Sequence, residues 1–217
     1  MGHVSGAILV ATGTKREAAT LTQSGFLVIP GGGDAAALTA KLIAAAPGAR
    51  GVMSFGFAGA LDDALKLGDW VIGERVAGAA QATCDPAWAQ TLAAQIPGAR
   101  RGACYADGRL IADASEKREL GQRGLLAADM ESHIAAQIAV ELDLPFAIVR
   151  CVSDEARHIL PPAIAHAMRP DGGVDGWSML GSVLRKPQQL PNLAGTISGF
   201  LRAMTALKQG AAYIRPC

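Results

Sequence analysis

Apolar and polar positions follow one another along this chain in a pattern that predicts short, fully apolar strands separated by helices. Strands buried on both faces read as continuous apolar runs of about four to eight residues, whereas helices repeat their apolar positions every three to four residues. The predicted strands are residues 7–11, 26–29, 51–57, 69–76 and 101–105, with two more ending near Asp129 and Asp154. The predicted helices start at Arg16 or span residues 34–46, 85–95 and 134–142.

Apolar strands that alternate with helices are typical of a sheet covered on both faces. We therefore predict an α/β fold, namely a single domain with a central mixed, mostly parallel β-sheet flanked by helices on both faces. The chain has 217 residues, of which 50% are hydrophobic. One domain spanning residues 1–217 can therefore bury a large core.

The composition of the chain changes after Asp154. Residues 160–192 are rich in proline and glycine, which limits helices to short pieces, and they form a candidate lid segment. An apolar helical face around Trp177 and Met179 is interpreted as core or, as a minority interpretation, as a wall against an apolar ligand. A longer C-terminal helix is predicted over residues 193–209.

Charge and residue spacing exclude several classes of function. The net charge is +1 without clustered Lys and Arg, so we do not expect nucleic-acid binding. The four Cys and four His show no ligand spacing, so we expect no metal and no cofactor, and Cys151 is predicted to be a buried thiol. No apolar run approaches the roughly 20 residues that span a bilayer, and Lys15 and Arg16 interrupt the first one. We expect a cytoplasmic protein without an integral membrane segment.

Two acidic segments form the most informative pattern. Residues 128–132 (ADMES) and 148–155 (IVRCVSDE) each end an apolar run with carboxylates. Side chains just past the carboxyl ends of parallel strands face the ligand crevice of an open α/β sheet, which makes Glu131 and Asp154 a candidate catalytic pair. The alternative is structural: Glu131 caps the following helix and Asp154 starts a turn.

These segments resemble the signature of the nucleoside phosphorylase and nucleosidase superfamily, in which Met-Glu leads into a helix and a strand V-V-R-x-x-S-D follows. The resemblance implies that Glu131 holds the ribose 2′-hydroxyl, that Met130 packs on the sugar, and that Asp154, beside Ser153, is the general acid for the purine. Residues 55–61 (FGFAGAL) and 67–73 (LGDWVIG) are similar to the family motifs G-x-A-G-[GA]-L and L-x-x-G-D-x-[VI]-I. Three matching segments in the family order also assign Phe57 and Ala58 to the substrate site.

The N-terminal loop bears on whether water or phosphate attacks the sugar. Family hydrolases have G-A-M-E-x-E, in which a Glu positions the water, whereas residues 12–17 read TGTKRE with Lys15 and Arg16 in place of acidic residues. A guanidinium at a glycine loop that opens a helix suits a phosphate dianion. We therefore predict a phosphate site at Gly13, Arg16 and Gly56, with inorganic phosphate as co-substrate. The alternative is that Lys15 and Arg16 are exposed first-turn residues.

Cleavage of an N-ribosidic bond builds positive charge on the sugar and leaves electrons on the purine. We expect Glu131 to stay ionised and to stabilise the cation. Burial in apolar surroundings raises the pKa of a carboxyl and suits Asp154 to donate a proton; alternatively, Arg157 pairs with Asp154 and holds it ionised. The segment 113–117 lacks the aromatic residue with which relatives contact the purine.

Three functions follow. The first is phosphorolysis of an adenine-type nucleoside; the chain looks most like the hopanoid biosynthesis-associated phosphorylases, which implies an adenosylated hopanoid with a bulky apolar 5′ group and contact with a lipid-like substrate. The second is a hydrolytic nucleosidase acting on methylthioadenosine or adenosylhomocysteine-like substrates. The third is a non-catalytic nucleoside-binding protein. Family members usually form oligomers, and we predict a homodimer.

Overall fold

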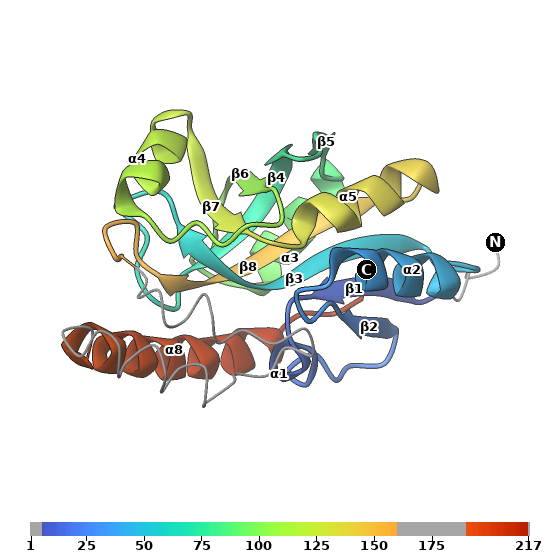
Figure 1. The fold of residues 1–217 in the computed structure, drawn as a ribbon. Coiled ribbons are helices and arrows are strands. Elements are labelled where there is room, and N and C mark those ends of the chain that lie inside the picture. Colours follow the sequence, from blue (N-terminus) through green and yellow to red (C-terminus); the bar gives the residue numbers. More distant parts are fainter. Residues whose placement is uncertain (1–5, 160–189, 217) are drawn as a thin grey trace.

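The computed structural model describes residues 6–159 and 190–216 (Figure 1). Within these ranges a mixed sheet has helices packed on both faces, which confirms the predicted α/β class. The candidate lid, residues 160–192, lies outside the described residues except where the last helix begins. We describe no structure for the rest of that segment.

The strands agree closely with the apolar runs of the sequence. They are β1 (Ile8–Thr12), β2 (Phe26–Pro30), β3 (Gly51–Ala60), β4 (Trp70–Gly78), β5 (Ala82–Thr83), β6 (Arg100–Ala106), β7 (Leu125–Asp129) and β8 (Phe146–Asp154). Strand β3 extends three residues beyond its predicted end at Phe57, because the small residues that follow remain paired with both β7 and β8.

The helices are α1 (Lys15–Ala18), α2 (Ala35–Ala45), α3 (Pro86–Gln95), α4 (Ala114–Gln122), α5 (Ser132–Glu141) and α8 (Leu190–Ala211). Asp34 caps α2 as predicted, because its side chain accepts a hydrogen bond from the Ala37 N–H at 2.9 Å. Helix α4 was not predicted from the sequence, because it is largely polar and shows no apolar stripe. Within the described residues, no helix has the length and apolar content needed to cross a membrane.

Strand pairing closes part of the sheet into a ring. Strand β3 pairs in parallel with β8, β8 antiparallel with β4, β4 in parallel with β6 and β6 in parallel with β7. The carboxyl end of β3 pairs antiparallel with β7 and completes the ring, while β1, followed by β2, pairs with the first residues of β3 on the edge away from β8. Parallel pairs outnumber antiparallel ones, as the continuous apolar runs indicated.

Two apolar layers cover the two faces of the sheet. Strand β8 sends Ile148 and Val152 to one layer and Val149 and Cys151 to the other, as the two-residue period of a strand requires. The first layer contains residues of α2 and α5, and the second contains residues of α3 and α8. Cys151 is fully buried, which confirms its predicted place as a core thiol. The polar residues considered next lie where these strands end.

Candidate active site

Two levels along β3 organise the candidate site. Beside β3, strand β8 places Arg150 next to Gly56 and Asp154 next to Gly59. Strand β7 runs antiparallel to β3 with Ala128 opposite Gly59, so the chain that leaves β7 heads back towards Gly56. Three residues of extended strand cover about 10 Å, and the site therefore has a Gly56 end and a Gly59 end.

The Gly56 end holds an acidic cluster, which we define as Glu17, Asp129, Glu131 and Arg150. Arg150 is fully buried, and its Nη2 donates to Asp129 Oδ1 at 2.8 Å. Its Nη1 lies 3.9 Å from Glu131 Oε2. The other contacts of Arg150 are to neutral groups, namely the hydroxyls of Ser54 and Ser132 and the Phe57 carbonyl. The three carboxyl groups of the cluster therefore share one guanidinium.

Glu17 enters this cluster from the first turn of α1. Its Oε1 accepts a hydrogen bond from the Phe57 N–H at 2.7 Å, and its Oε2 accepts one from the Thr14 N–H. A methyl group placed on Gly13 would lie 3.0 Å from a Glu17 carboxylate oxygen and 3.1 Å from one of Glu131. Those two oxygens are therefore no more than about 6 Å apart, and the two carboxyl groups border the same space beside Gly13.

Glu131 does not cap α5, which excludes the structural alternative for this residue. It occupies the N-cap position but makes no capping hydrogen bond with its side chain. Asp129 does so instead, because its Oδ1 accepts from the Glu131 N–H at 2.9 Å and from the Ser132 N–H at 2.7 Å. The Glu131 carboxyl is thereby left to face Gly13 and Arg150.

Gly56 is required at its position by the approach of Glu17. Its φ is +146°, and a Cβ atom there would lie 2.3 Å from Glu17 Oε1. Only a residue without a side chain lets the carboxylate reach the Phe57 N–H in this backbone conformation. The glycine-rich run of β3 thus accommodates a carboxylate of the protein itself.

The two glutamates of the cluster hold their protons more tightly than free glutamate does. Burial raises the pKa of Glu131 to about 8, against the lowering effect of Arg150 and with further raising by Asp129 and Glu17. Burial also raises the pKa of Glu17, opposed by the hydrogen bonds from Phe57 and Thr14. The expectation that Glu131 stays ionised at neutral pH is therefore wrong for the protein without ligand.

The Gly59 end holds a buried ion pair between Lys117 and Asp154. Lys117 comes from α4 and is fully buried, and its ammonium donates to Asp154 Oδ2. The other carboxylate oxygen of Asp154 accepts a hydrogen bond from Ser153 Oγ at 2.9 Å. Asp154 is the last residue of β8 and is 7% exposed, so it does not start a free turn.

Of the two sequence-based expectations for the surroundings of Asp154, the burial is confirmed and the pairing with Arg157 is wrong. Arg157 does not pair with Asp154, because its guanidinium binds Asp63 at 2.7 Å on the exposed surface. The carboxylate does not lie among apolar groups alone either, since Lys117 contacts it directly. The segment 113–117 thus contributes a cation where the sequence comparison sought an aromatic ring.

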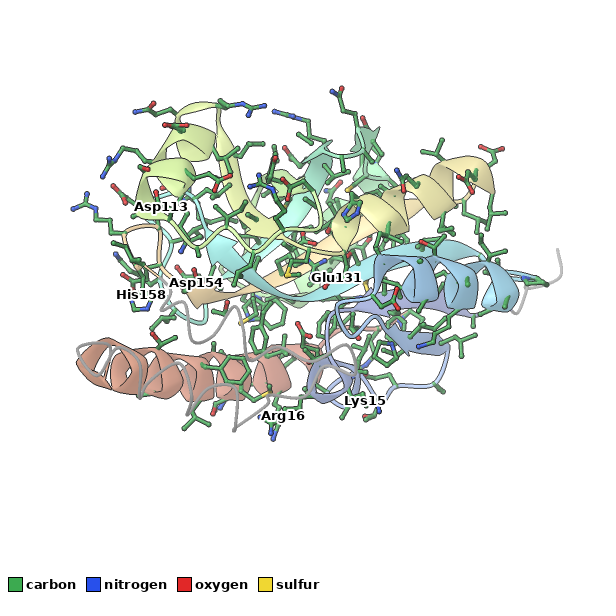
Figure 2. The ribbon with its side chains drawn as sticks, viewed as in Figure 1. Lys15, Arg16, Asp113, Glu131, Asp154 and His158 are labelled. Atoms are coloured by element: carbon green, nitrogen blue, oxygen red, sulfur yellow. The ribbon has the colours of Figure 1, made fainter. Side chains whose placement is uncertain are left out.

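The structure brings most of the predicted site residues together, and Figure 2 shows Glu131 and Asp154 along the same band of the sheet. Met130 precedes Glu131 and is half-buried, and the Ala58 carbonyl accepts from Ser153 Oγ at 3.3 Å. The Phe57 ring packs on Phe200 of α8, with ring centroids 5.2 Å apart. All of these residues adjoin the path between the Gly56 and Gly59 ends.

The predicted phosphate residues are not brought together in the same way. Gly13 adjoins the carboxyls of Glu17 and Glu131, and Gly56 adjoins Glu17 and the guanidinium of Arg150, which pairs with Asp129. Lys15 and Arg16 are exposed, and Figure 2 shows Arg16 at the outer edge of the molecule, away from Glu131. A negatively charged group of the chain therefore occupies the place where the sequence predicts an anion to bind.

Sequence reasoning overlooked two residues of the site. Glu17 carried a usable signal, because Thr14 and Glu17 form a capping box that turns the Glu side chain back over the loop. Lys117 carried none, since it meets Asp154 only through the folding of α4 against the end of β8. Among the described residues no cluster of potential metal ligands is present.

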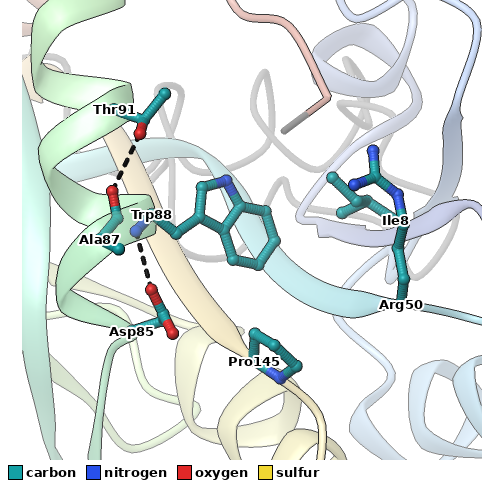
Figure 3. Close-up of a pocket in the computed structure, with 7 residues that line it drawn as sticks. All are labelled: Ile8, Arg50, Asp85, Ala87, Trp88, Thr91 and Pro145. Atoms are coloured by element: carbon teal, nitrogen blue, oxygen red, sulfur yellow. Dashed lines mark hydrogen bonds between the residues drawn. The ribbon is translucent and has the colours of Figure 1, made fainter. Parts of the chain in front are cut away.

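A separate cavity of about 260 Å³ lies at the opposite ends of the strands (Figure 3). It is lined by Ile8 at the start of β1, by Arg50 and Pro145 just before β3 and β8, and by Trp88 of α3. The acidic cluster and the Lys117–Asp154 pair lie at the carboxyl ends of these strands, so the cavity is not part of the candidate site.

Comparison with known families identifies the class of protein. Residues 2–168 match the family model described as the phosphorylase superfamily, and the chain belongs to this superfamily. No curated protein matches the chain. The closer likeness to hopanoid-associated phosphorylases stays a prediction.

Solved structures with the same fold include nucleosidases. A 5′-methylthioadenosine/S-adenosylhomocysteine nucleosidase from Neisseria meningitidis, in complex with methylthio-immucillin-A, is 19% identical with a TM-score of 0.61, covering 82% of this chain and 98% of that chain. The corresponding Helicobacter pylori nucleosidase is 14% identical with a TM-score of 0.62, covering 97% and 99%. Futalosine hydrolase of Helicobacter pylori is 16% identical with a TM-score of 0.59, covering 94% and 99%. At these identities the likeness concerns the fold.

Proposed function

We propose that this protein cleaves the N-ribosidic bond of a purine nucleoside, adenine-type as in its structural neighbours' names, and that water attacks the sugar. The observation that carries this proposal is the pair of carboxyls at the Gly56 end, Glu17 and Glu131, which approach the same side of Gly13. One carboxylate is suited to orient and deprotonate a water, and the other to bind the ribose 2′-hydroxyl and stabilise positive charge on the sugar.

The remaining roles follow from the order of groups along β3. Asp154, at the Gly59 end, serves the leaving purine, with Ser153 holding its second oxygen. Met130 and the half-buried Phe57 border the sugar between the two ends. From the Gly56 end to the Gly59 end, the residues would therefore contact first the attacking water, then the ribose and then the purine base.

Electrostatics favour water over phosphate. A phosphate dianion at Gly13 and Gly56 would lie against the carboxyls of Glu17 and Glu131, and Arg150, the cation that the described residues place beside Gly56, already pairs with Asp129. An ionised carboxylate repels a dianion strongly where water is excluded, and a protonated carboxyl offers it no positive charge. Phosphorolysis is the competing reaction, supported by the basic side chains of Lys15 and Arg16 on the first turn of α1.

The aromatic pair of Phe57 and Phe200 adjoins the site from the α8 side and would contact the 5′ substituent of the nucleoside. Apolar rings at this position suit an apolar 5′ group, from a methylthio group to an adenosylated hopanoid. The homodimer, the cytoplasmic location and contact with a lipid-like substrate stay predictions.

A base-release assay tests the proposal. Adenosine, methylthioadenosine and a 5′-alkyl adenosine are incubated with the protein, with and without inorganic phosphate. We expect free adenine at equal rates in both conditions, and a loss of about 100-fold or more in Glu17→Gln. Glu119→Gln, at an exposed position of α4, is the matched control.

Two outcomes would overturn this function. Release that requires phosphate would establish phosphorolysis. If no base is released from any substrate while Asp154→Asn keeps the nucleoside affinity of the wild type, the protein is a binding protein without catalysis.

A further inference from the structure

Lys117 is the only lysine among the described residues that is fully buried. Its ammonium has three N–H groups and three acceptors: Asp154 Oδ2, the His158 carbonyl at 3.0 Å and the Glu155 carbonyl at 3.3 Å. Every donor of the ammonium is thereby used. Lys117 joins α4 to the end of β8 and to the turn that follows it.

Burial of an ammonium is costly unless its partners are fixed in good geometry. The turn after β8 does not require a buried ammonium, since water or a neutral donor could form hydrogen bonds with the carbonyls of Glu155 and His158. The carboxylate is different, because Asp154 is itself nearly buried and, within residues 6–159 and 190–216, has only Ser153 as a further side-chain partner. The pair therefore fixes both oxygens of one carboxyl group.

The fixed carboxyl group is the one that the proposed function assigns to the leaving purine. An Asp that is ion-paired to an ammonium carries no proton of its own to donate. The ammonium does carry one, in direct hydrogen bond with Asp154 Oδ2. The proton for the leaving group is therefore held by Lys117, whereas the group that faces the purine is Asp154.

We propose that Lys117 is a positioning residue that holds Asp154 towards the departing base and supplies the proton that Asp154 passes on. This proposal rests on the proposed function. When the bond between the sugar and the purine breaks, its electron pair goes to the purine. The Lys117 ammonium gives one proton to Asp154 Oδ2 and becomes neutral, and Asp154 passes this same proton to a purine nitrogen, so that the carboxylate gains and loses one proton. The attacking water loses a proton to the Glu17 carboxylate, and this proton returns to Lys117 through solvent after the products leave.

The proposal is tested with two leaving groups. Adenine needs protonation to leave, whereas p-nitrophenolate does not. In Lys117→Met, adenosine cleavage should fall by about 100-fold or more, while cleavage of p-nitrophenyl β-ribofuranoside should change by less than about 3-fold. Asp154→Asn should show the same selectivity. Arg118→Met, at the next and exposed position of α4, should leave both rates unchanged.

A double variant protects the test against misfolding. Lys117→Met leaves Asp154 buried without its counter-ion, whereas Lys117→Met combined with Asp154→Asn leaves no buried charge. If the two residues act as one unit, this double variant should cleave adenosine as slowly as Asp154→Asn alone and no slower. A further loss of tenfold or more would show independent roles and overturn the proposal.

The remaining outcomes also decide the matter. Equal losses on both substrates in folded Lys117→Met would show that Lys117 only supports the structure. Adenosine cleavage at the wild-type rate would show that it does not act through Asp154. If the wild-type protein cleaves neither substrate, the proposed function itself fails, which the wild-type controls reveal before any variant is compared.

Discussion

The two ends of the candidate site differ in their balance of charge. At the Gly56 end, the carboxyls of Glu17, Asp129 and Glu131 share the single guanidinium of Arg150. At the Gly59 end, Lys117 and Asp154 pair one to one. The first arrangement has an excess of acid, and burial raises the pKa of both of its glutamates, whereas the second pairs one cation with one carboxylate.

This difference matches the charges that develop during N-ribosidic cleavage. The sugar becomes positive, and an excess of carboxyl groups stabilises that charge. The purine becomes negative, and a carboxylate backed by an ammonium can deliver a proton without adding net negative charge. In the proposed reaction, the Gly56 end would stabilise the sugar cation and the Gly59 end would deliver the proton, three residues apart along β3.

The largest effect on this comparison is expected from Arg150→Met. Removal of the only guanidinium leaves the buried carboxyls of the acidic cluster without a counter-ion, and we expect a loss of about 3–5 kcal/mol in the free energy of unfolding. Urea denaturation at pH 7.5 measures this value. The loss should shrink at pH 5, where Glu17 and Glu131, whose pKa values burial raises, bind their protons more fully; an equal loss at both pH values would contradict the charge balance described above.

Glu131→Gln should change stability in a direction that depends on pH. Burial raises the pKa of Glu131 to about 8 in the folded protein, whereas a glutamate of the unfolded chain has its ordinary pKa of about 4.5. The unfolded state therefore binds fewer protons between these values, and wild-type stability falls as the pH rises through this window. Gln mimics the protonated carboxyl and escapes this loss.

We therefore expect Glu131→Gln to match the wild type at or below pH 4.5 and to exceed it by on the order of 4 kcal/mol above pH 8. Urea denaturation at pH 4.5 and 8.5 gives the two differences, and Glu141→Gln at the exposed end of α5 is the control. A variant that is less stable than the wild type at pH 8.5 would show that Glu131 is ionised in the folded protein.

Gly56→Ala should separate backbone strain from catalysis. The new methyl group collides with Glu17 Oε1, and the alanine must adopt a φ that suits glycine. We therefore expect a loss of about 1–3 kcal/mol in the free energy of unfolding and a loss of most of the base-release activity. Gly33→Ala is a matched control, because Gly33 also has a positive φ but has no atom within 4 Å of an added Cβ. Full activity in Gly56→Ala would contradict the placement of Glu17 in the site.

The smallest effect is expected from Arg157→Met. Arg157 pairs with Asp63, and the side chains are 82% and 57% exposed. Exposed ion pairs contribute about 0–1 kcal/mol, and Arg157 does not contact Asp154. Thermal unfolding and base release should both stay close to the wild type. A large loss of activity would revive the sequence-based pairing of Arg157 with Asp154.

The sequence allowed the layout of the fold to be predicted because the relevant signals are local. Continuous apolar runs marked the strands, and Asp34 and Asp85 marked helix starts at which the structure finds capping hydrogen bonds. Helix α4 was missed because it is polar, and the extension of β3 was missed because pairing beyond Phe57 depends on β7 and β8.

The site was only partly predictable for the same reason. Glu131 and Asp154 follow strand ends directly, so their position is visible in the sequence. Lys117 acts across 37 positions of the chain, and no local pattern announces that contact. Glu17 was not predicted as a site residue because the charges of Lys15 and Arg16 indicated a phosphate site, although the side chains of these two residues face solvent.

Labelled water tests the central claim most directly. The protein is incubated with adenosine in ¹⁸O-enriched water, with and without inorganic phosphate, and the sugar product is identified by mass spectrometry. We predict free ribose that carries one ¹⁸O atom, at a rate that phosphate does not raise. Formation of ribose 1-phosphate, with unlabelled sugar and a rate that depends on phosphate, would contradict the account.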